Sequence, residues 1–156
     1  SLDADDIEVM KKEISNWGRW GEDDQKGALN LITPQVRKEA AALVTEGISV
    51  STARDVIKTI APDNPRPFMH TMVGFGEQWN SDNYSVSYHG FAHSHMDALC
   101  HYIDAGKLYN GFSASGVTEK GAAKLDIRNA KEGIFTRGVL IDATKLKNQK
   151  YTCFPL

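Results

Sequence analysis

The stretch from Tyr88 to Tyr102 constrains this chain more than any other part of its sequence. It reads YHGFAHSHMDALCHY and contains four of the five histidines of the chain and one carboxylate. These residues are His89, His93, His95, His101 and Asp97. Imidazole and carboxylate groups are the usual protein ligands of divalent metal ions. The cluster therefore predicts a metal or catalytic site rather than a chance grouping of surface histidines.

An extended backbone would place several of these side chains together, because alternate residues of a strand share one face. That face would carry His89, Phe91, His93, His95 and Asp97. His95 and Asp97 are then two ligands, and either His93 or His89 is the third; we favour His93, which is nearer in sequence. Ligands two residues apart lie about 7 Å apart on a straight strand. The strand must therefore bend, and Gly90 is the residue that permits this.

Size and charge narrow the classes of protein that fit. With 156 residues, 41% of them hydrophobic, the chain suits a single domain with its own core. A net charge of -2 gives no reason to expect nucleic acid or a membrane surface as a partner. The acidic, polar start is unlike a secretory signal, so the expected location is the cytoplasm. Cys100 and Cys153 make no disulfide framework; Cys100 is either a soft metal ligand or, as we favour, a small buried residue.

The hydrophobic pattern predicts a mixed α/β fold with a central sheet. Helical spacing of apolar residues predicts a helix over residues 5–15, and Thr33-Pro34 reads as the N-cap and first residue of a second helix that ends near Gly47. Strands are expected at residues 48–53, 68–75 and 133–143, besides the histidine-rich stretch. The last of these contains the continuous apolar run Val139-Leu140-Ile141, which is typical of a strand buried on both faces.

Two tryptophans, Trp17 and Trp20, lie in a glycine-containing segment near the N-terminus. One interpretation is that they pack this segment onto the body of the protein. The other is that they form an aromatic wall for a planar substrate. The sequence leaves both interpretations open.

The histidine-rich stretch resembles the motif H-x-G-T-H-x-D-x-P-x-H of the cyclase family of metal-dependent hydrolases, which includes bacterial-type kynurenine formamidase and isatin hydrolase. His95, Asp97 and His101 match its second histidine, its aspartate and its last histidine. Phe91 replaces the first histidine, a metal ligand in the family. The flanking runs NWGRWGEDDQKGALNLITP and DALCHYIDAGKLYNG also look like one branch of this family, so the resemblance covers most of the chain.

The resemblance implies a swivelling β/β/α domain over residues 1–156, with an N-terminal arm at about 1–34 and a metal-motif region at about 84–111. It implies hydrolysis of an amide-like bond in an aryl formamide, a lactam or a lactone, with zinc or manganese as cofactor and a homo-oligomeric assembly. His93, His95, Asp97 and His89 are the expected metal ligands, and His101 is the expected catalytic acid and base. Substrate contacts are expected from Trp17, Trp20 and Phe91.

Members of the family continue with a downstream histidine and glutamate at the site, whereas this chain has no histidine after His101. We therefore expect an N-terminal portion of a cyclase-family protein, or a divergent short form. A metal-binding or interaction fragment without catalysis is the alternative function. A non-haem iron oxygenase would also use a pair such as His95 and Asp97, but it requires a distant histidine that the sequence lacks.

Overall fold

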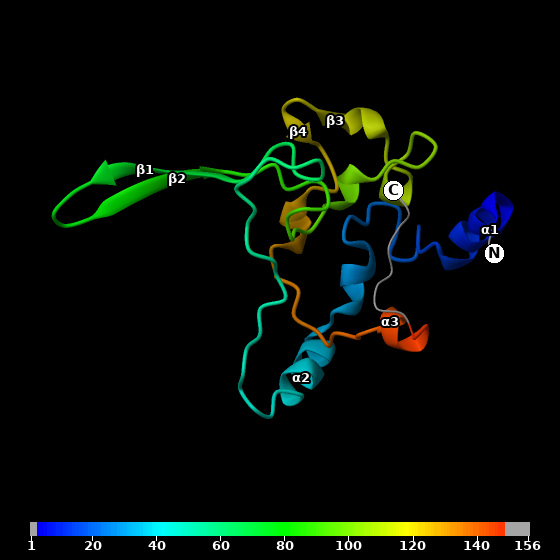
Figure 1. The fold of residues 1–156 in the computed structure, drawn as a ribbon. Helices are drawn as coiled ribbons and strands as arrows, with labels where there is room; N and C mark the ends of the chain where they lie inside the picture. The colour runs from blue at the N-terminus through cyan, green and yellow to red at the C-terminus, as the bar shows by residue number, and fades with distance from the viewer. Residues whose placement is uncertain (1–2, 149–156) are drawn as a thin grey trace.

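The structure, a computed structural model, describes residues 3–148 and mixes helices with short strands (Figure 1). The helices are α1 (Ala4–Ile14), α2 (Pro34–Ala42) and α3 (Ala143–Leu146). The strands are β1 (Met69–Phe75), β2 (Asn80–Ser85), β3 (Val117–Thr118) and β4 (Gly121–Ala122). Short 3₁₀ turns lie at Gly27–Leu31, Leu99–His101, Tyr109–Gly111, Ala114–Gly116 and Ile127–Ala130. The mixed α/β class is confirmed, and no helix of residues 3–148 is long and apolar enough to cross a membrane.

Local capping explains where the two longer helices begin. Asp3 and Asp6 form a reciprocal capping box at the start of α1, since each side chain accepts a hydrogen bond from the other's backbone N–H. Thr33 Oγ1 accepts from Val36 N at the start of α2, and Pro34 occupies the first helical turn. Both predicted helices are therefore confirmed. The second ends at Ala42, somewhat before the predicted stop at Gly47.

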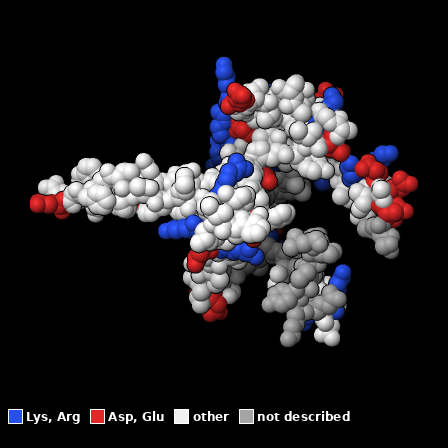
Figure 2. Space-filling view, turned by 45° about the horizontal axis from the view of Figure 1, so that its top comes forward, with Lys and Arg blue, Asp and Glu red and all other residues white. Residues whose placement is uncertain are grey.

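Among the described residues, each strand pairs only with its neighbour in sequence. β1 and β2 form an antiparallel hairpin, with Met69 opposite Ser85 and Phe75 opposite Asn80. A bulge interrupts the register between Met72 and Gly74. The hairpin projects away from the rest of the chain (Figure 1), and charged side chains are sparse along it (Figure 2). The strand predicted at residues 68–75 is confirmed as β1.

We call residues 16–31 and 98–130 the inner unit, because the small apolar core lies there. Cys100, Leu108 and Leu125 form this core and are 6%, 2% and 1% exposed. Five partly buried side chains pack against them: Ala98, Tyr109, Phe112, Ala114 and Ala122. The backbone N–H of Leu125 donates to Gln25 Oε1, which joins the two segments. The expectation that Cys100 is a small buried residue is confirmed.

Two polar side chains hold the N-terminal loop of the inner unit against its C-terminal segment. Asp24 accepts hydrogen bonds from Tyr109 Oη (2.9 Å), Asn30 Nδ2 (2.7 Å) and Gly27 N (2.9 Å). Asn110 accepts from Gly18 N and donates to the carbonyl oxygens of residues 21, 22 and 24. Asn110 has φ +60°, a conformation that asparagine tolerates better than most residues. These bonds give hydrogen-bond partners to polar groups of the loop backbone.

The expected central sheet does not form within residues 3–148, where the strands make two separate two-stranded sheets. Residues 48–53 and 133–142 carry no strand, so both of those strand predictions are wrong for the described chain. Val139, Leu140 and Ile141 are 74%, 89% and 76% exposed rather than buried. The apolar pattern shows what these residues would bury, but a strand also needs a hydrogen-bonded neighbour, and none is present here.

Candidate metal centre

Three histidine side chains surround the carboxylate of Asp97. Its Oδ1 atom lies 2.8 Å from His89 Nδ1 and 3.6 Å from His95 Nε2. The same oxygen lies 3.3 Å from His101 Nδ1, which donates a hydrogen bond to it. Ligand atoms of His89, His95 and Asp97 all fall within 4.8 Å of one another. Two ligands of one zinc ion are up to about 4.2 Å apart, so the group has nearly the size that one ion requires.

The orientation of the His95 ring indicates what lies between its Nε2 atom and the Asp97 carboxylate. Its Nδ1 lies 2.8 Å from the backbone oxygen of His93, which can only accept, so Nδ1 carries the proton. In the neutral ring Nε2 then presents a lone pair toward the Asp97 carboxylate. Two acceptors 3.6 Å apart need a cation or a proton between them. A histidine that donates its other N–H to a carbonyl is also the usual arrangement of a metal ligand.

The backbone between His89 and His101 explains how residues from one stretch reach one point. Gly90 has φ +135°, and residues 89–93 form bends in place of a strand. Only glycine adopts that φ without strain. After Asp97, the 3₁₀ turn Leu99–His101 brings the His101 ring back to the carboxylate four residues earlier. The straight strand expected here is therefore wrong, and the bend expected at Gly90 is confirmed.

The site is open to solvent on one side. The Asp97 side chain is 51% exposed and that of His89 is 49% exposed, whereas that of His95 is only 19% exposed. Partial desolvation raises the pKa of the Asp97 carboxyl, but the hydrogen bond from His101 and the charges of His89 and His95 outweigh it. The pKa of Asp97 is therefore lowered, and the carboxylate is ionised and able to bind a cation.

His93, the third ligand that we favoured, lies outside this group. It is 8% exposed, and both of its ring nitrogens are buried without a hydrogen-bond partner among the described residues. Because the bends at 89–93 break the alternation of side chains, His93 turns inward while His89 turns toward Asp97. The geometry thus favours His89 over His93 as the third ligand.

The aromatic side chains expected at the substrate lie apart from the metal group. Trp17 lines a shallow pocket with Lys11 and Tyr102 that contains none of the grouped ligands. Trp20 is half-buried beneath the Arg19 guanidinium, 4.9 Å from its ring centroid. Phe91 is 92% exposed. The substrate contacts expected from these three rings therefore stay predictions.

The sequence analysis did not single out some of the residues that surround the metal group. An apolar pocket lies against Asp97, and residues 25–29 and 125–134 contribute to it. Asp24 and Asn110, which fix the loop leading to that pocket, looked like ordinary loop residues. The bond between Asp24 and Tyr109 spans 85 residues and that between Asn110 and Gly21 spans 89, so only a known fold could have identified these contacts.

No protein-family model matches the chain, and neither does any curated protein. Among solved structures, the chain is similar to one described as a novel cyclase, with 32% sequence identity and a TM-score of 0.78. The similarity covers 88% of this chain and 50% of that protein, so the chain spans half the length of the solved cyclase. The histidine-rich motif and this structural match agree, and the described chain shares its fold with one part of a cyclase-family protein.

Proposed function

We propose that this chain carries the metal site of a cyclase-family hydrolase that cleaves an amide-like bond. The orientation of His95 carries the proposal, because its Nδ1 is engaged by the backbone oxygen of His93 and its Nε2 faces the Asp97 carboxylate at 3.6 Å, a geometry that suits a cation between the two groups. His89, His95 and Asp97 would hold a divalent ion, and the mixed imidazole and carboxylate set suits zinc or manganese. Similarity to a solved cyclase supports an enzyme rather than a storage site.

The chain's own residues supply the remaining parts of the chemistry. A bound divalent ion would make water acidic and polarise a carbonyl group. His101 donates from Nδ1 to Asp97, so its Nε2 is the nitrogen left to take a proton from a water nucleophile and return it to the leaving nitrogen. Asp97 fixes the orientation of the His101 ring. We propose an aryl formamide, a lactam or a lactone as the substrate, from the family resemblance.

The metal content of purified protein tests the ligand set. We expect Asp97→Ala and His89→Ala to lose bound zinc or manganese, and His93→Ala to keep it. His70→Ala is the matched control, because His70 pairs with Asp82 on the hairpin, away from the site. Elemental analysis of the four variants, purified alike, gives the comparison. Full occupancy in Asp97→Ala would refute the site, and loss in His93→Ala but not in His89→Ala would reverse our choice of third ligand.

Hydrolysis of formanilide by the metal-loaded protein tests the reaction class. His101→Ala should keep its metal and lose about 10²- to 10⁴-fold in turnover, the usual contribution of general acid–base catalysis. A His101→Ala protein that stays fully active would exclude the catalytic role. One that loses its metal would make His101 a ligand.

A second candidate function is metal binding without catalysis. It is favoured by the exposure of Asp97 and His89, since an active site normally excludes water. Stoichiometric metal in the wild-type protein, with no hydrolysis of formanilide or of a lactam, would favour this function over the first.

A further inference from the structure

An apolar pocket of about 230 Å³ lies directly against the Asp97 carboxylate. Its aliphatic wall comes from Leu29, Met96, Leu99, Ile127 and Ile134, with Leu125 of the core beneath. The wall joins three segments that are distant in sequence, so it is a product of the fold of the inner unit. None of Trp17, Trp20 and Phe91 lines it.

The polar groups around this pocket already have partners. Gln25 Oε1 accepts from Leu125 N at 2.9 Å, and Asn129 Nδ2 donates to the backbone oxygen of Asp126 at 3.0 Å. Lys26 Nζ pairs with Glu132 at 3.2 Å, and the Asp126 carboxylate pairs with Arg128. An uncharged apolar group could enter without disturbing any of these pairs.

The volume limits what can enter. A cavity of about 150 Å³ lined by aliphatic side chains accommodates benzene. A pocket of about 230 Å³ thus has room for one aromatic ring with a substituent. A ligand whose ring lies in the pocket and whose substituent reaches Asp97 would place that substituent beside the candidate metal ligands.

We propose that this pocket binds the uncharged aromatic ring of the substrate, with the reacting carbonyl group directed to Asp97 and His95. The inference rests on the proposed hydrolase function for the identity of the reacting group, but the ring site itself does not depend on it. Leu29, Ile127 and Ile134 are then the residues that determine specificity. The ring is recognised through apolar contact alone.

A second pocket beside the metal group is the main competitor. It opens at His95 and is lined by Val56, Phe68, Val86 and Arg54. Its volume of about 410 Å³ is larger, but it is less enclosed and exposes the Arg54 guanidinium, which has no ion-pair partner among the described residues. An uncharged ring would leave that cation without a partner, so this pocket suits it less well.

Toluene is a suitable probe, because it has the ring and no reacting group. In the metal-loaded protein, we expect toluene to shift the methyl NMR signals of Met96, Ile127 and Ile134 and to leave those of Val56 and Val86 unchanged. Shifts centred on Val56 and Val86 would overturn the proposal.

Filling the pocket gives the second arm of the test. Ile127→Trp and Ile134→Trp place a large ring in the pocket, and both positions are about half exposed, at 48% and 46%, so the fold should tolerate them. Each should weaken toluene binding at least about 10-fold, the scale on which apolar pockets discriminate. Val56→Trp, in the competing pocket, is the matched control and should bind toluene as the wild type does. Unchanged binding in both filled variants would refute the site.

Asp97→Asn separates this proposal from the proposed function. It removes the charge that the metal needs and keeps the pocket wall. Toluene binding that survives in Asp97→Asn would support the ring site even if the metal-loaded wild-type protein hydrolyses no formanilide, a result that would count only against the hydrolase. Hydrolysis of formanilide that is unaffected by Ile127→Trp and Ile134→Trp would support the hydrolase and place its ring elsewhere.

Discussion

Apolar side chains are buried in the inner unit but exposed on the projecting segments, by which we mean the β1–β2 hairpin and residues 133–142. In the inner unit, Leu108 and Leu125 are almost completely buried, and the loop carbonyls around them are hydrogen-bonded to Asn110. On the hairpin and at residues 133–142, side chains of the same kind face solvent, as with Phe75 at 83% and Leu140 at 89% exposure. The candidate metal group lies between the two regions.

The total solvent-accessible surface area of the chain reflects the same contrast. The chain exposes 13596 Å², whereas a compact monomer of 17.2 kDa exposes about 7,800 Å². The difference exceeds the area of a standard protein–protein interface and is on the scale of obligate ones. The hairpin and residues 133–142 contribute exposed apolar side chains to this surface. We propose that a second copy of the chain covers part of them.

Truncating the core of the inner unit should have the largest effect. Leu108→Ala removes a side chain that is 2% exposed and should lower the free energy of unfolding by about 2–5 kcal/mol. Leu140→Ala, at 89% exposure, should change it by no more than about 0.5 kcal/mol. Urea denaturation of both variants gives the comparison. Equal losses would show that the two regions do not differ as described.

A bound metal ion should stabilise the folded protein. A ligand that binds only the folded state at 100 times its dissociation constant adds about 2.7 kcal/mol. We expect zinc or manganese at that excess to raise the melting temperature of the wild-type protein. The same addition to Asp97→Ala should give no rise, and a rise there would place the stabilising metal elsewhere.

Tyr109→Phe removes the Tyr109 hydroxyl and should lower the free energy of unfolding by a smaller amount, about 1.5 kcal/mol, because it breaks one hydrogen bond to a charged group. Burial alone would raise the pKa of Asp24. Hydrogen bonds from Asn30, Gly27 and Tyr109 outweigh the effect of burial, so the pKa of Asp24 is lowered. Burial and the bond to Asp24 raise the pKa of Tyr109 to about 12.

The stability of the wild-type protein should therefore depend on pH at both ends of the range. The contribution of Asp24 is present above its unfolded pKa of about 3.9 and is lost as the pH falls through the lowered folded value. That of Tyr109 is present below about pH 10 and is lost as the pH rises toward 12. Denaturation of Tyr109→Phe across pH should show no such alkaline loss. An alkaline loss as large as that of the wild type would contradict the pairing.

A charge on a projecting segment should have the smallest effect on stability and a visible effect on assembly. Leu140→Lys should change the free energy of unfolding by no more than about 0.5 kcal/mol. It should weaken self-association, measured by sedimentation equilibrium, because a lysine is costly to bury in an interface. Gln35→Lys, on the exposed face of α2, is the control and should associate as the wild type does. A wild-type protein that stays monomeric at high concentration would contradict the proposed second copy.

The two regions also differ in how far the sequence predicts them. The helix starts at Asp3 and Thr33 follow from capping side chains within three residues, so local chemistry suffices. The apolar pattern at 139–141 identifies residues that need burial, but their pairing depends on a partner strand that the pattern does not specify. Local signals therefore predict the elements, and non-local pairing decides which of them become strands.

The candidate site shows the same division. His95, Asp97 and His101 are close in sequence, so their convergence could be anticipated from spacing. Gly90 signalled the bend, but the sequence did not show whether the bend turns His89 or His93 toward Asp97, because that depends on the backbone angles, such as the φ of +135° at Gly90. The apolar wall of Leu29 and Ile127 could not be predicted, because its residues are about 100 positions apart and meet only in the fold.

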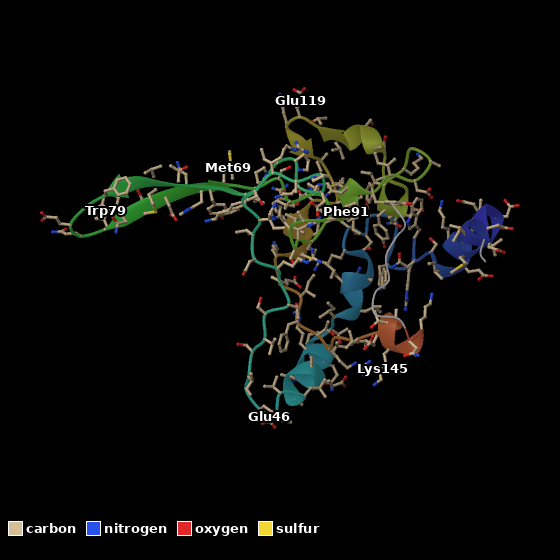
Figure 3. All side chains as sticks on the ribbon, viewed as in Figure 1. Glu46, Met69, Trp79, Phe91, Glu119 and Lys145 are labelled. Carbon is tan, nitrogen blue, oxygen red and sulfur yellow. The ribbon has the colours of Figure 1, made fainter. Side chains whose placement is uncertain are left out.

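Trp79 gives the hairpin an optical signal of its own. It is 69% exposed, at the end of the hairpin far from the rest of the chain (Figure 3), and its ring approaches only its own turn. An indole in that position emits like one in water and is open to collisional quenchers. If another molecule covers the hairpin, the emission of Trp79 should shift to the blue and its quenching should fall, while the half-buried Trp20 reports separately on the inner unit.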